Sequence, residues 1–284
     1  MIEIGSIAID IVSDGLFALD GGAMFGVVPK TLWQKVAKVD KENRLLLGLN
    51  CLLIWTKHKT ILVDVGLGTK LSPKMRRILA VDRTEELESS IKKHLSPEEI
   101  DMVILTHLHF DHIGGLYRKN KGGKLVPNFP NAQIVVQADE YKAAFLPDDR
   151  TIGSYDQENF APLKDSPSLV LVKGNKSICR GVRVIKTGGH TPGHQIVQVS
   201  SQGKTLVFWG DLIPTSYHLK IPYISAYDID PQTTVKQKKT LLEQAAAEQW
   251  LCLFEHNPKR RLGYIEKTVD ENRRIKYRLR RYLG

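Results

Sequence analysis

Three histidines and one aspartate stand within six residues near the middle of the 284-residue chain: His107, His109, Asp111 and His112. Imidazole and carboxylate groups are the ligands that zinc and other borderline divalent ions take in proteins. Four such strongly solvated groups are costly to hold together unless a cation shares them. The spacing therefore predicts a metal site, and the alternative interpretation is a set of histidines on a helix surface or in a loop.

This cluster directly follows a continuous apolar run at residues 102–105, which predicts a strand buried on both faces. Three more ligand-type residues come just after predicted strands: His190 in the glycine-rich turn GGHTPGH, Asp211 and His256. The C-terminal ends of strands in a parallel or mixed α/β sheet meet at one edge, where sites form. We therefore expect these residues to converge on the first cluster, which supports a metal site more strongly than the first motif alone.

Composition narrows the class of protein. A chain with 42% hydrophobic residues can bury a sizeable core. No apolar run approaches the roughly 18–20 residues of a membrane span, and Met-Ile-Glu opens no signal peptide. Cys51, Cys179 and Cys252 lack CxxC spacing and lie in apolar surroundings, which is typical of small core residues rather than disulfides or thiolate ligands. We expect a soluble, cytoplasmic protein with no membrane association.

The net charge of +10 is concentrated at the C-terminal end, where residues 257–284 hold ten lysines and arginines against three acidic residues. Ile275, Leu279 and Leu283 recur between these charges at helical spacing. This pattern predicts a packed amphipathic helix over about residues 268–283. The alternative is a tail that binds nucleic acid, anionic lipid or an acidic partner.

The stretch 14–33 near the N-terminus is more apolar than a solvated loop should be. A strand over 4–12 is expected to end at Gly15, and the glycines that follow argue against a long helix. We therefore expect an apolar loop that packs against its own core, against a partner subunit, or over a pocket that it helps to close.

The remaining periodicity predicts a mixture of strands and helices. A hairpin over 50–55 and 60–65 carries Asp64 at its end, where a carboxylate is also a common turn cap. Residues 96–99 read SPEE, a helix-capping box. Further expected elements are helices at 84–95 and 139–145, strands at 133–137, 168–172 and 182–186, and a surface loop at 117–130. No repeat or linker divides the chain, so we expect one domain over residues 1–284.

The motif HxHxDH at 107–112, the GGHTPGH turn, the GD of Asp211 and the EH of His256 resemble those of the metallo-β-lactamase fold superfamily. The resemblance extends from about residue 45 to residue 260 and includes Asp64. It implies an α/β fold, an αβ/βα four-layer sandwich of two mixed β-sheets with helices on the outside. It also implies that the stretch 14–33 borders the substrate. The candidate pocket residues are then Phe17, Leu19, Met24, Phe25 and Tyr223.

The resemblance further implies two divalent metal ions per chain. One ion would be held by His107, His109 and His190, the other by Asp111, His112 and His256, with Asp211 bridging the two. Asp64 and His194 would support these ligands without touching the metals. Neutral imidazoles and carboxylates without a thiolate favour Zn²⁺, with Fe, Mn or Co as alternatives.

Two such ions can share a water and lower its pKa toward about 7, which supplies a metal-bridging hydroxide for hydrolysis. Asp111 would ligate a metal and also orient this hydroxide or take its proton. Local sequences such as FGVVPK, GDLIPT and FEH look most like the lactonase, arylesterase and phosphotriesterase group. This implies a small lactone or a carboxylic or phosphoric ester as substrate. Separately, the apolar stretch around Phe25 could join two copies into a homodimer.

One position departs from the quorum-quenching lactonases, which commonly have a tyrosine three residues after the bridging aspartate. Pro214 stands there in this chain. Tyr217 and His218 are the first candidates to replace that tyrosine as catalytic residues, and Tyr223 is the last.

Other activities on the same metal site stay open as alternatives. A nucleic-acid phosphodiesterase of the RNA-processing branch could use the basic C-terminal end. A thioester hydrolase of the hydroxyacylglutathione type shares the GHTPGH turn, but those enzymes carry a further helical domain and only 28 residues follow His256 here. The β-lactamases proper generally lack the aspartate at Asp211, and redox-active flavo-diiron relatives carry Glu where this chain has His109.

Overall fold

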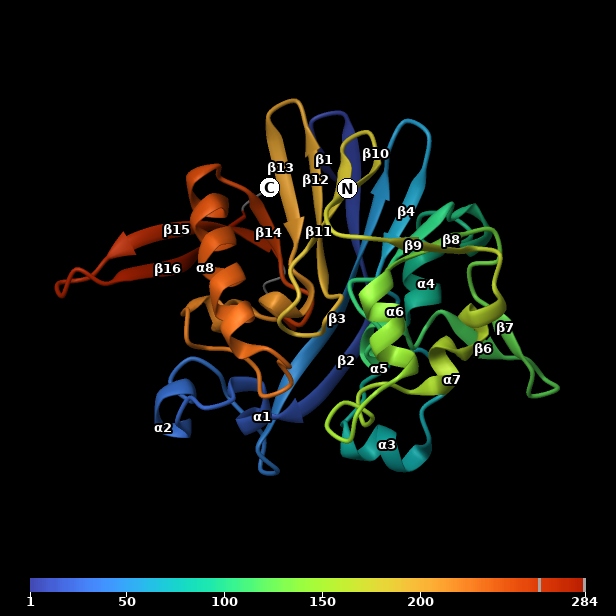
Figure 1. Cartoon of the computed structure of the whole chain (residues 1–284), viewed down its shortest axis with the longest axis horizontal. Helices are drawn as coiled ribbons and strands as arrows, with labels where there is room; N and C mark the ends of the chain where they lie inside the picture. Colours follow the sequence, from blue (N-terminus) through green and yellow to red (C-terminus); the bar gives the residue numbers. More distant parts are fainter. Residues whose placement is uncertain (260–261, 283–284) are drawn as a thin grey trace.

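The computed structural model describes residues 1–259 and 262–282, and its centre consists of two mixed sheets of seven strands each (Figure 1). The first sheet has the order β1-β2-β3-β4-β5-β8-β9. Its strands are β1 (Ile2–Ile4), β2 (Ile7–Asp20), β3 (Arg44–Trp55), β4 (Thr60–Val63), β5 (Met102–Ile104), β8 (Gln133–Gln137) and β9 (Leu169–Val172). Strands β1 to β4 pair antiparallel, whereas β4, β5, β8 and β9 run parallel.

The second sheet has the order β10 to β16, and its only parallel pair among the described residues is β13 with β14. Its strands are β10 (Lys176–Cys179), β11 (Val182–Lys186), β12 (Gln195–Ser201), β13 (Lys204–Phe208), β14 (Leu251–Leu253), β15 (Leu262–Val269) and β16 (Ile275–Arg281). A small separate hairpin consists of β6 (Tyr117–Lys119) and β7 (Leu125–Pro127).

Helices cover the outer faces of both sheets (Figure 1). The α-helices are α1 (Gly21–Phe25), α2 (Lys30–Trp33), α3 (Pro73–Ile78), α4 (Leu87–Ile91), α5 (Phe110–Ile113), α6 (Ala138–Phe145), α7 (Gln157–Phe160) and α8 (Pro231–Ala247). The 3₁₀ helices are η1 (Pro97–Glu99), η2 (Ala161–Asp165), η3 (Gly210–Leu212) and η4 (Ser216–Leu219). Helices α4, α6 and α7 pack on the first sheet and α8 on the second, which confirms the predicted four-layer sandwich.

The main core lies between the two sheets. Leu52 and Ile54 of the first sheet share one buried cluster with Val197, Leu206 and Phe208 of the second. Strands that are buried on both faces need no polar alternation, which explains the continuous apolar runs in the sequence. Burying apolar surface on both sides contributes about 25 cal/mol per Å² and holds the layers together.

The direction of the parallel strands brings the ligand loops to one edge. Strand β4 is parallel to β5, so the loop that carries Asp64 begins at the same edge as the loop that carries His107. Strand β13 is parallel to β14, so Asp211 and His256 likewise follow strand ends on one side. In Figure 1 these ends point toward α1 and α5. The predicted convergence of strand ends is therefore confirmed.

The prediction of an apolar loop over 14–33 is wrong for its first half. Strand β2 continues through Gly15 to Asp20, with an irregular register between Ser13 and Leu16. Gly15 has a φ of 96°, which permits the bulge without ending the strand. The pairing partner of residues 16–20 is β3, far along the chain, so local glycine signals could not reveal it. Helices α1 and α2 then occupy the second half.

The prediction of a basic C-terminal helix is also wrong. Residues 262–281 form the hairpin of β15 and β16, with register pairs from Gly263↔Arg281 to Val269↔Ile275. The Asp270 side chain accepts the backbone N–H groups of Asn272 and Arg274 and closes the turn. Pairing of β15 with β14 supplies the backbone partners that a helix would have supplied internally. Leu283, the last apolar residue of the predicted helix, lies outside the described residues, as do Arg260 and Arg261.

Two smaller expectations also need correction. The helix predicted at 84–95 is only the five residues of α4. The buried Asp14 carboxylate accepts the Leu87 N–H at the start of α4 and so fixes where it begins. The surface loop predicted at 117–130 contains the β6–β7 hairpin. The capping box at 96–99 is present, on η1.

Among the described residues, none of the helices has the length and apolar character needed to span a lipid bilayer.

Candidate metal centre

Three buried imidazoles form one cluster at this edge. His107 and His109 come from the loop between β5 and α5, and His190 comes from the glycine-rich turn between β11 and β12. The ring of His107 lies 4.5 Å from that of His109 and 4.8 Å from that of His190, centroid to centroid. Nδ1 of His109 lies 3.1 Å from Nε2 of His190. Ring nitrogens of all three lie within 4.8 Å of one another, the spacing of ligands around a single cation.

A second cluster lies beside the first. Nε2 of His112 and Nε2 of His256 each lie 3.7 Å from Oδ2 of Asp111. His112 and Asp111 sit on α5, and His256 follows β14. The backbone N–H of His256 donates to Pro214 O, and its Nδ1 lies 2.8 Å from Gly48 O, so two other loops hold this residue in place.

Asp211 lies between the two clusters and contacts both. Its Oδ2 is 3.2 Å from Nε2 of His190, and its Oδ1 is 3.0 Å from Nε2 of His256. Burial alone would raise the pKa of this carboxyl, but the charges of His256, His190 and His112 outweigh burial and hold the pKa well below its ordinary value. An ionised carboxylate with one oxygen directed to each cluster is the arrangement that a bridging ligand requires.

The residues of the site fit a pair of divalent cations. In the described part of the chain, Nε2 of His107 and Nε2 of His112 are buried in the site without a hydrogen-bond partner. Buried polar atoms without partners are costly and rare. Burial lowers the pKa of His107 and of His109 well below the usual value, so both are neutral and present a lone pair.

Asp64 and His194 lie directly behind the ligand residues. Asp64 accepts the backbone N–H and the hydroxyl of Thr106 at 2.7 and 2.6 Å, and its Oδ2 lies 3.0 Å from Nδ1 of His112. His194 accepts the Asp211 backbone N–H at Nε2, 3.0 Å away. Burial lowers the pKa of His194 well below its usual value, which keeps this nitrogen free to accept. Both side chains thus contact residues of the candidate site, Asp64 at His112 and His194 at Asp211.

Other residues in this outer layer were not identified from the sequence. Asp228 lies 2.8 Å from Nδ1 of His190, Glu255 lies 3.0 Å from Nδ1 of His112, and Glu140 contacts the loops of both His109 and His190. Such partners orient a ligand imidazole and set its tautomer. Glu255 could have been suspected from its place before His256 at a strand end. Asp228 and Glu140 stand in segments with no metal-type spacing.

The candidate catalytic residues after Asp211 contact other protein groups in the structure. Both ring nitrogens of His218 are occupied, Nδ1 by the Thr215 hydroxyl at 2.8 Å and Nε2 by Met24 O at 2.8 Å. The His218 ring stacks on Phe25 with centroids 4.7 Å apart. The Tyr223 hydroxyl accepts from Lys220, 3.3 Å away. Tyr217 packs on the apolar cluster that contains Phe25 and Tyr223, and it also lines a surface pocket beside β16.

The candidate pocket residues form a tightly packed cluster next to His256. Phe17, Met24, Phe25 and Tyr223 are at most 5% exposed, and Phe17 meets the His256 ring edge-on at 5.6 Å. Leu19 is partly exposed at the border of this cluster. Tyr227, which the sequence analysis did not single out, is 37% exposed. Desolvation and the negative charges of Asp111 and Asp20 raise the pKa of its phenol.

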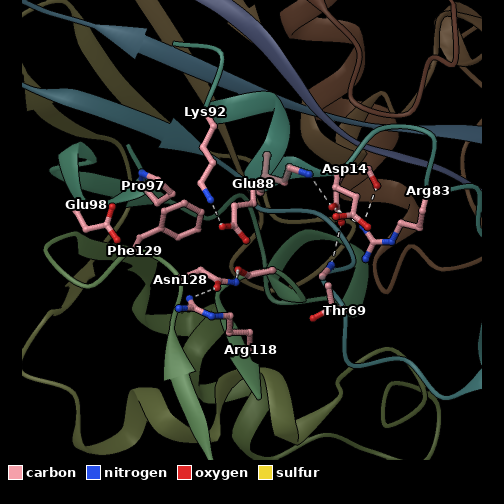
Figure 2. Close-up of a pocket in the computed structure, with 14 residues that line it drawn as sticks. Asp14, Thr69, Arg83, Glu88, Lys92, Pro97, Glu98, Arg118, Asn128 and Phe129 are labelled. Carbon is pink, nitrogen blue, oxygen red and sulfur yellow. Dashed lines mark hydrogen bonds and ion pairs between the residues drawn. The ribbon is translucent and has the colours of Figure 1, made fainter. Parts of the chain in front are cut away.

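A separate cavity of about 270 Å³ lies between α4 and the β6–β7 hairpin (Figure 2). None of the predicted metal ligands lines it. Each of its three basic side chains bonds to another residue of the lining: Arg83 to Asp14 at 2.5 Å, Lys92 to Glu88 at 2.5 Å, and Arg118 to the Asn128 side chain at 2.6 Å. We therefore assign no chemistry to this cavity.

Solved structures share the complete fold. A probable metal-dependent hydrolase from Staphylococcus aureus superposes with a TM-score of 0.86 at 32% identity, and the match covers 100% of both chains. AidC, described as a dizinc quorum-quenching lactonase in complex with a product, superposes with a TM-score of 0.79 at 24% identity, covering 100% of this chain and 97% of AidC. At that identity the likeness to AidC shows the fold alone.

Sequence comparison identifies the family. The family model described as the Metallo-beta-lactamase superfamily matches residues 46–256, and the chain belongs to this superfamily. The family predicted from the sequence motifs is thus confirmed. An N-acyl homoserine lactonase from Bacillus cereus is 26% identical over 242 residues, which are 78% of this chain and 86% of that protein.

Proposed function

We propose that this protein is a dinuclear metal-dependent hydrolase that acts on a lactone or on a carboxylic or phosphoric ester. The observation that carries the proposal is the position of Asp211, whose two oxygens lie 3.2 Å from His190 and 3.0 Å from His256. A carboxylate shared by two ligand clusters serves two cations rather than one. The cations we propose are Zn²⁺, because the ligands are imidazoles and carboxylates without a thiolate.

The chemistry divides between the metals and the chain. When bound, two divalent ions would lower the pKa of a shared water and polarise the substrate oxygen. Asp111, with Oδ2 at 3.7 Å from both His112 and His256, stands where it can orient that water and hold its proton. Phe17 and the residues packed on it present apolar surface beside His256 and exclude bulk water from that side.

Relatives support the substrate class. The Bacillus cereus relative is an N-acyl homoserine lactonase, and two structural relatives are described with N-hexanoyl homoserine products bound. A lactone is an internal carboxylic ester, so the same metal site could also open aryl esters. Because His218 has both nitrogens engaged and Pro214 replaces the expected tyrosine, we propose a lactone preference that depends on contacts other than these two residues.

The test combines metal analysis with a substrate panel. Purified protein should hold about two equivalents of zinc per chain, hydrolyse at least one of N-acyl lactones, aliphatic lactones, aryl esters and phosphotriesters, and lose this turnover on chelation. The matched control is His109→Ala, compared with the same change at His94, which lies away from the site near Asp10. If the wild type turned over none of these substrates faster than His109→Ala does, the proposal would be overturned. Turnover of only a thioester or of RNA would keep the metal centre and replace the substrate class.

A further inference from the structure

Glu140 is a fully buried carboxylate on α6. It accepts four hydrogen bonds: at Oε1 from the Leu108 N–H and the Tyr155 hydroxyl, both 3.0 Å away, and at Oε2 from the Thr191 hydroxyl at 2.5 Å and the Gly193 N–H at 3.2 Å. No lysine or arginine bonds to it among the described residues, so neutral donors alone satisfy its charge. A buried carboxylate is costly unless fully hydrogen-bonded, and here both oxygens are used twice.

The four donors come from the two loops that carry the three-histidine cluster and from the segment beside it. Leu108 lies between His107 and His109, so its N–H fixes the backbone that carries both imidazoles. Thr191 and Gly193 follow His190 in the glycine-rich turn. The carboxylate therefore spans the gap between loops that are 81 residues apart at His109 and His190.

Tyr155 adds a contact with a ligand ring. Its aromatic ring lies 5.0 Å from the His109 imidazole at an angle of 63°, and its hydroxyl donates to Glu140. The adjacent Ser154 accepts the Phe110 N–H at 3.0 Å, which fixes the other side of His109. The turn at Gly193 also packs closely against α6, since a Cβ at this position would lie 2.2 Å from the backbone nitrogen of Glu140.

We propose that Glu140 is the positioning residue of the three-histidine metal site: it holds the His107–His109 loop and the His190 turn at the separation that one cation requires, and it orients His109 through Tyr155. The proposal rests on the metal centre proposed above. Glu140 touches none of the residues of the second cluster in the described hydrogen bonds and ion pairs, so its effect should be confined to one of the two metals.

The first test replaces the carboxylate by an amide. In Glu140→Gln one oxygen becomes an NH₂ group, which then faces a backbone N–H donor instead of accepting from it. We expect one zinc equivalent to bind about 10- to 100-fold more weakly and the other to bind as in the wild type. The measurement is a competition titration of the loaded protein with a metallochromic chelator, which resolves the two equivalents. Asp139→Asn is the matched control, because Asp139 is the neighbouring carboxylate on α6 and pairs with Lys186 at the surface.

A second, milder variant keeps the test informative if Glu140→Gln fails to fold. Tyr155→Phe removes one of the four donors and no backbone contact, and we expect the same equivalent to weaken by a smaller factor. Gln195 ties the two loops together independently, through its N–H to Thr106 O at 3.0 Å and its side chain to Leu105 O at 2.8 Å, so the fold does not depend on Glu140 alone. Thermal unfolding of the metal-free variants checks that each protein is folded.

The outcomes separate this inference from the proposed function. If the wild type binds fewer than two equivalents, the dinuclear centre itself is wrong. If the wild type binds two and folded Glu140→Gln binds both with unchanged affinity, only the positioning role is overturned. Equal weakening of both equivalents, or lower thermal stability with unchanged affinity, would mean a merely structural carboxylate and would also overturn it.

Discussion

The imidazoles of the proposed metal site each have a fixed orientation, and the partners that fix them come from different parts of the chain. Nδ1 of His190 lies against Asp228, Nδ1 of His256 against Gly48 O, and Nδ1 of His112 against Asp64. Such contacts leave the opposite nitrogen of each ring directed into the site. His109 is the exception, because its Nδ1 is the nitrogen that faces His190. Residue type and spacing could predict the ligands but not the ring nitrogen that each one presents.

His218 illustrates how a plausible catalytic histidine becomes a buried structural group. Burial, reinforced by the positive charge of Lys238, lowers the pKa of His218 from 6.5 to about 3. The folded protein therefore keeps this ring neutral at pH values where the unfolded chain protonates it. The unfolded state binds more protons, so the stability that His218 contributes is present above pH 6.5 and is lost as the pH falls from 6.5 toward 3.

We predict that His218→Gln will weaken this acid sensitivity. Between pH 7 and pH 5 the metal-free wild type should lose about 2 kcal/mol more of its free energy of unfolding than the metal-free variant, because only the wild type has this histidine to protonate. Urea unfolding of both proteins at the two pH values measures the difference. Parallel losses in the two proteins would show that the buried ring does not control this part of the pH dependence.

At the scale of elements, the C-terminal hairpin decides which apolar residues are buried. A helix would have placed Ile275 and Leu279 on its packed face, whereas the hairpin leaves Ile275 48% exposed and buries Tyr277. The Tyr277 hydroxyl donates to Glu243 of α8 at 2.8 Å. Two basic residues of the hairpin pair with acids, Lys276 with Asp270 and Arg280 with Glu266, both at 3.0 Å. Part of the positive charge is thus paired within the hairpin.

We predict that truncating Tyr277 will lower the free energy of unfolding more than truncating Ile275. A C-terminal helix packed through Ile275 would give the reverse order. Tyr277→Ala should lower the free energy of unfolding by about 3 kcal/mol, because it removes a buried ring and leaves a cavity over α8. Ile275→Ala, its control in the same strand, should change it by less than about 0.5 kcal/mol, because that side chain is at the exposed turn end. Urea unfolding at pH 7 compares the variants. A larger loss for Ile275→Ala would contradict the hairpin.

At the scale of the whole molecule, the proposed metal centre lies where the two halves of the sandwich meet. His107, His109 and His112 follow the first sheet, and His190, Asp211 and His256 follow strands of the second sheet. Cations bound there would join the two sheets at one edge, much as the core between them joins their faces. Because the unfolded chain lacks this arrangement, metal binding should add directly to the stability of the fold.

We predict that chelation will destabilise the entire protein. At a free zinc concentration of about 100 times the dissociation constant, each bound ion adds about 2.7 kcal/mol. For a chain of this size, the contribution of each ion corresponds to roughly 5–10 °C in the melting temperature. Thermal unfolding of zinc-loaded and chelated protein measures the shift, and added zinc should reverse it. His109→Ala should show a smaller shift, and an unchanged melting temperature in the chelated wild type would contradict a centre that spans the two sheets.

The sequence by itself determined the types of the candidate ligands, their spacing and their places after buried strands, because these are local patterns. From them the α/β class and the convergence of His107, Asp211 and His256 followed, since parallel strands end at one edge. Only the tertiary structure decided how Asp211 is shared, how Glu140 joins two loops, and that the basic C-terminal segment is a hairpin. Each of these depends on contacts between residues far apart in the chain. Non-local pairing can override local helical spacing, because a strand obtains its hydrogen bonds from a neighbour that the local sequence does not contain.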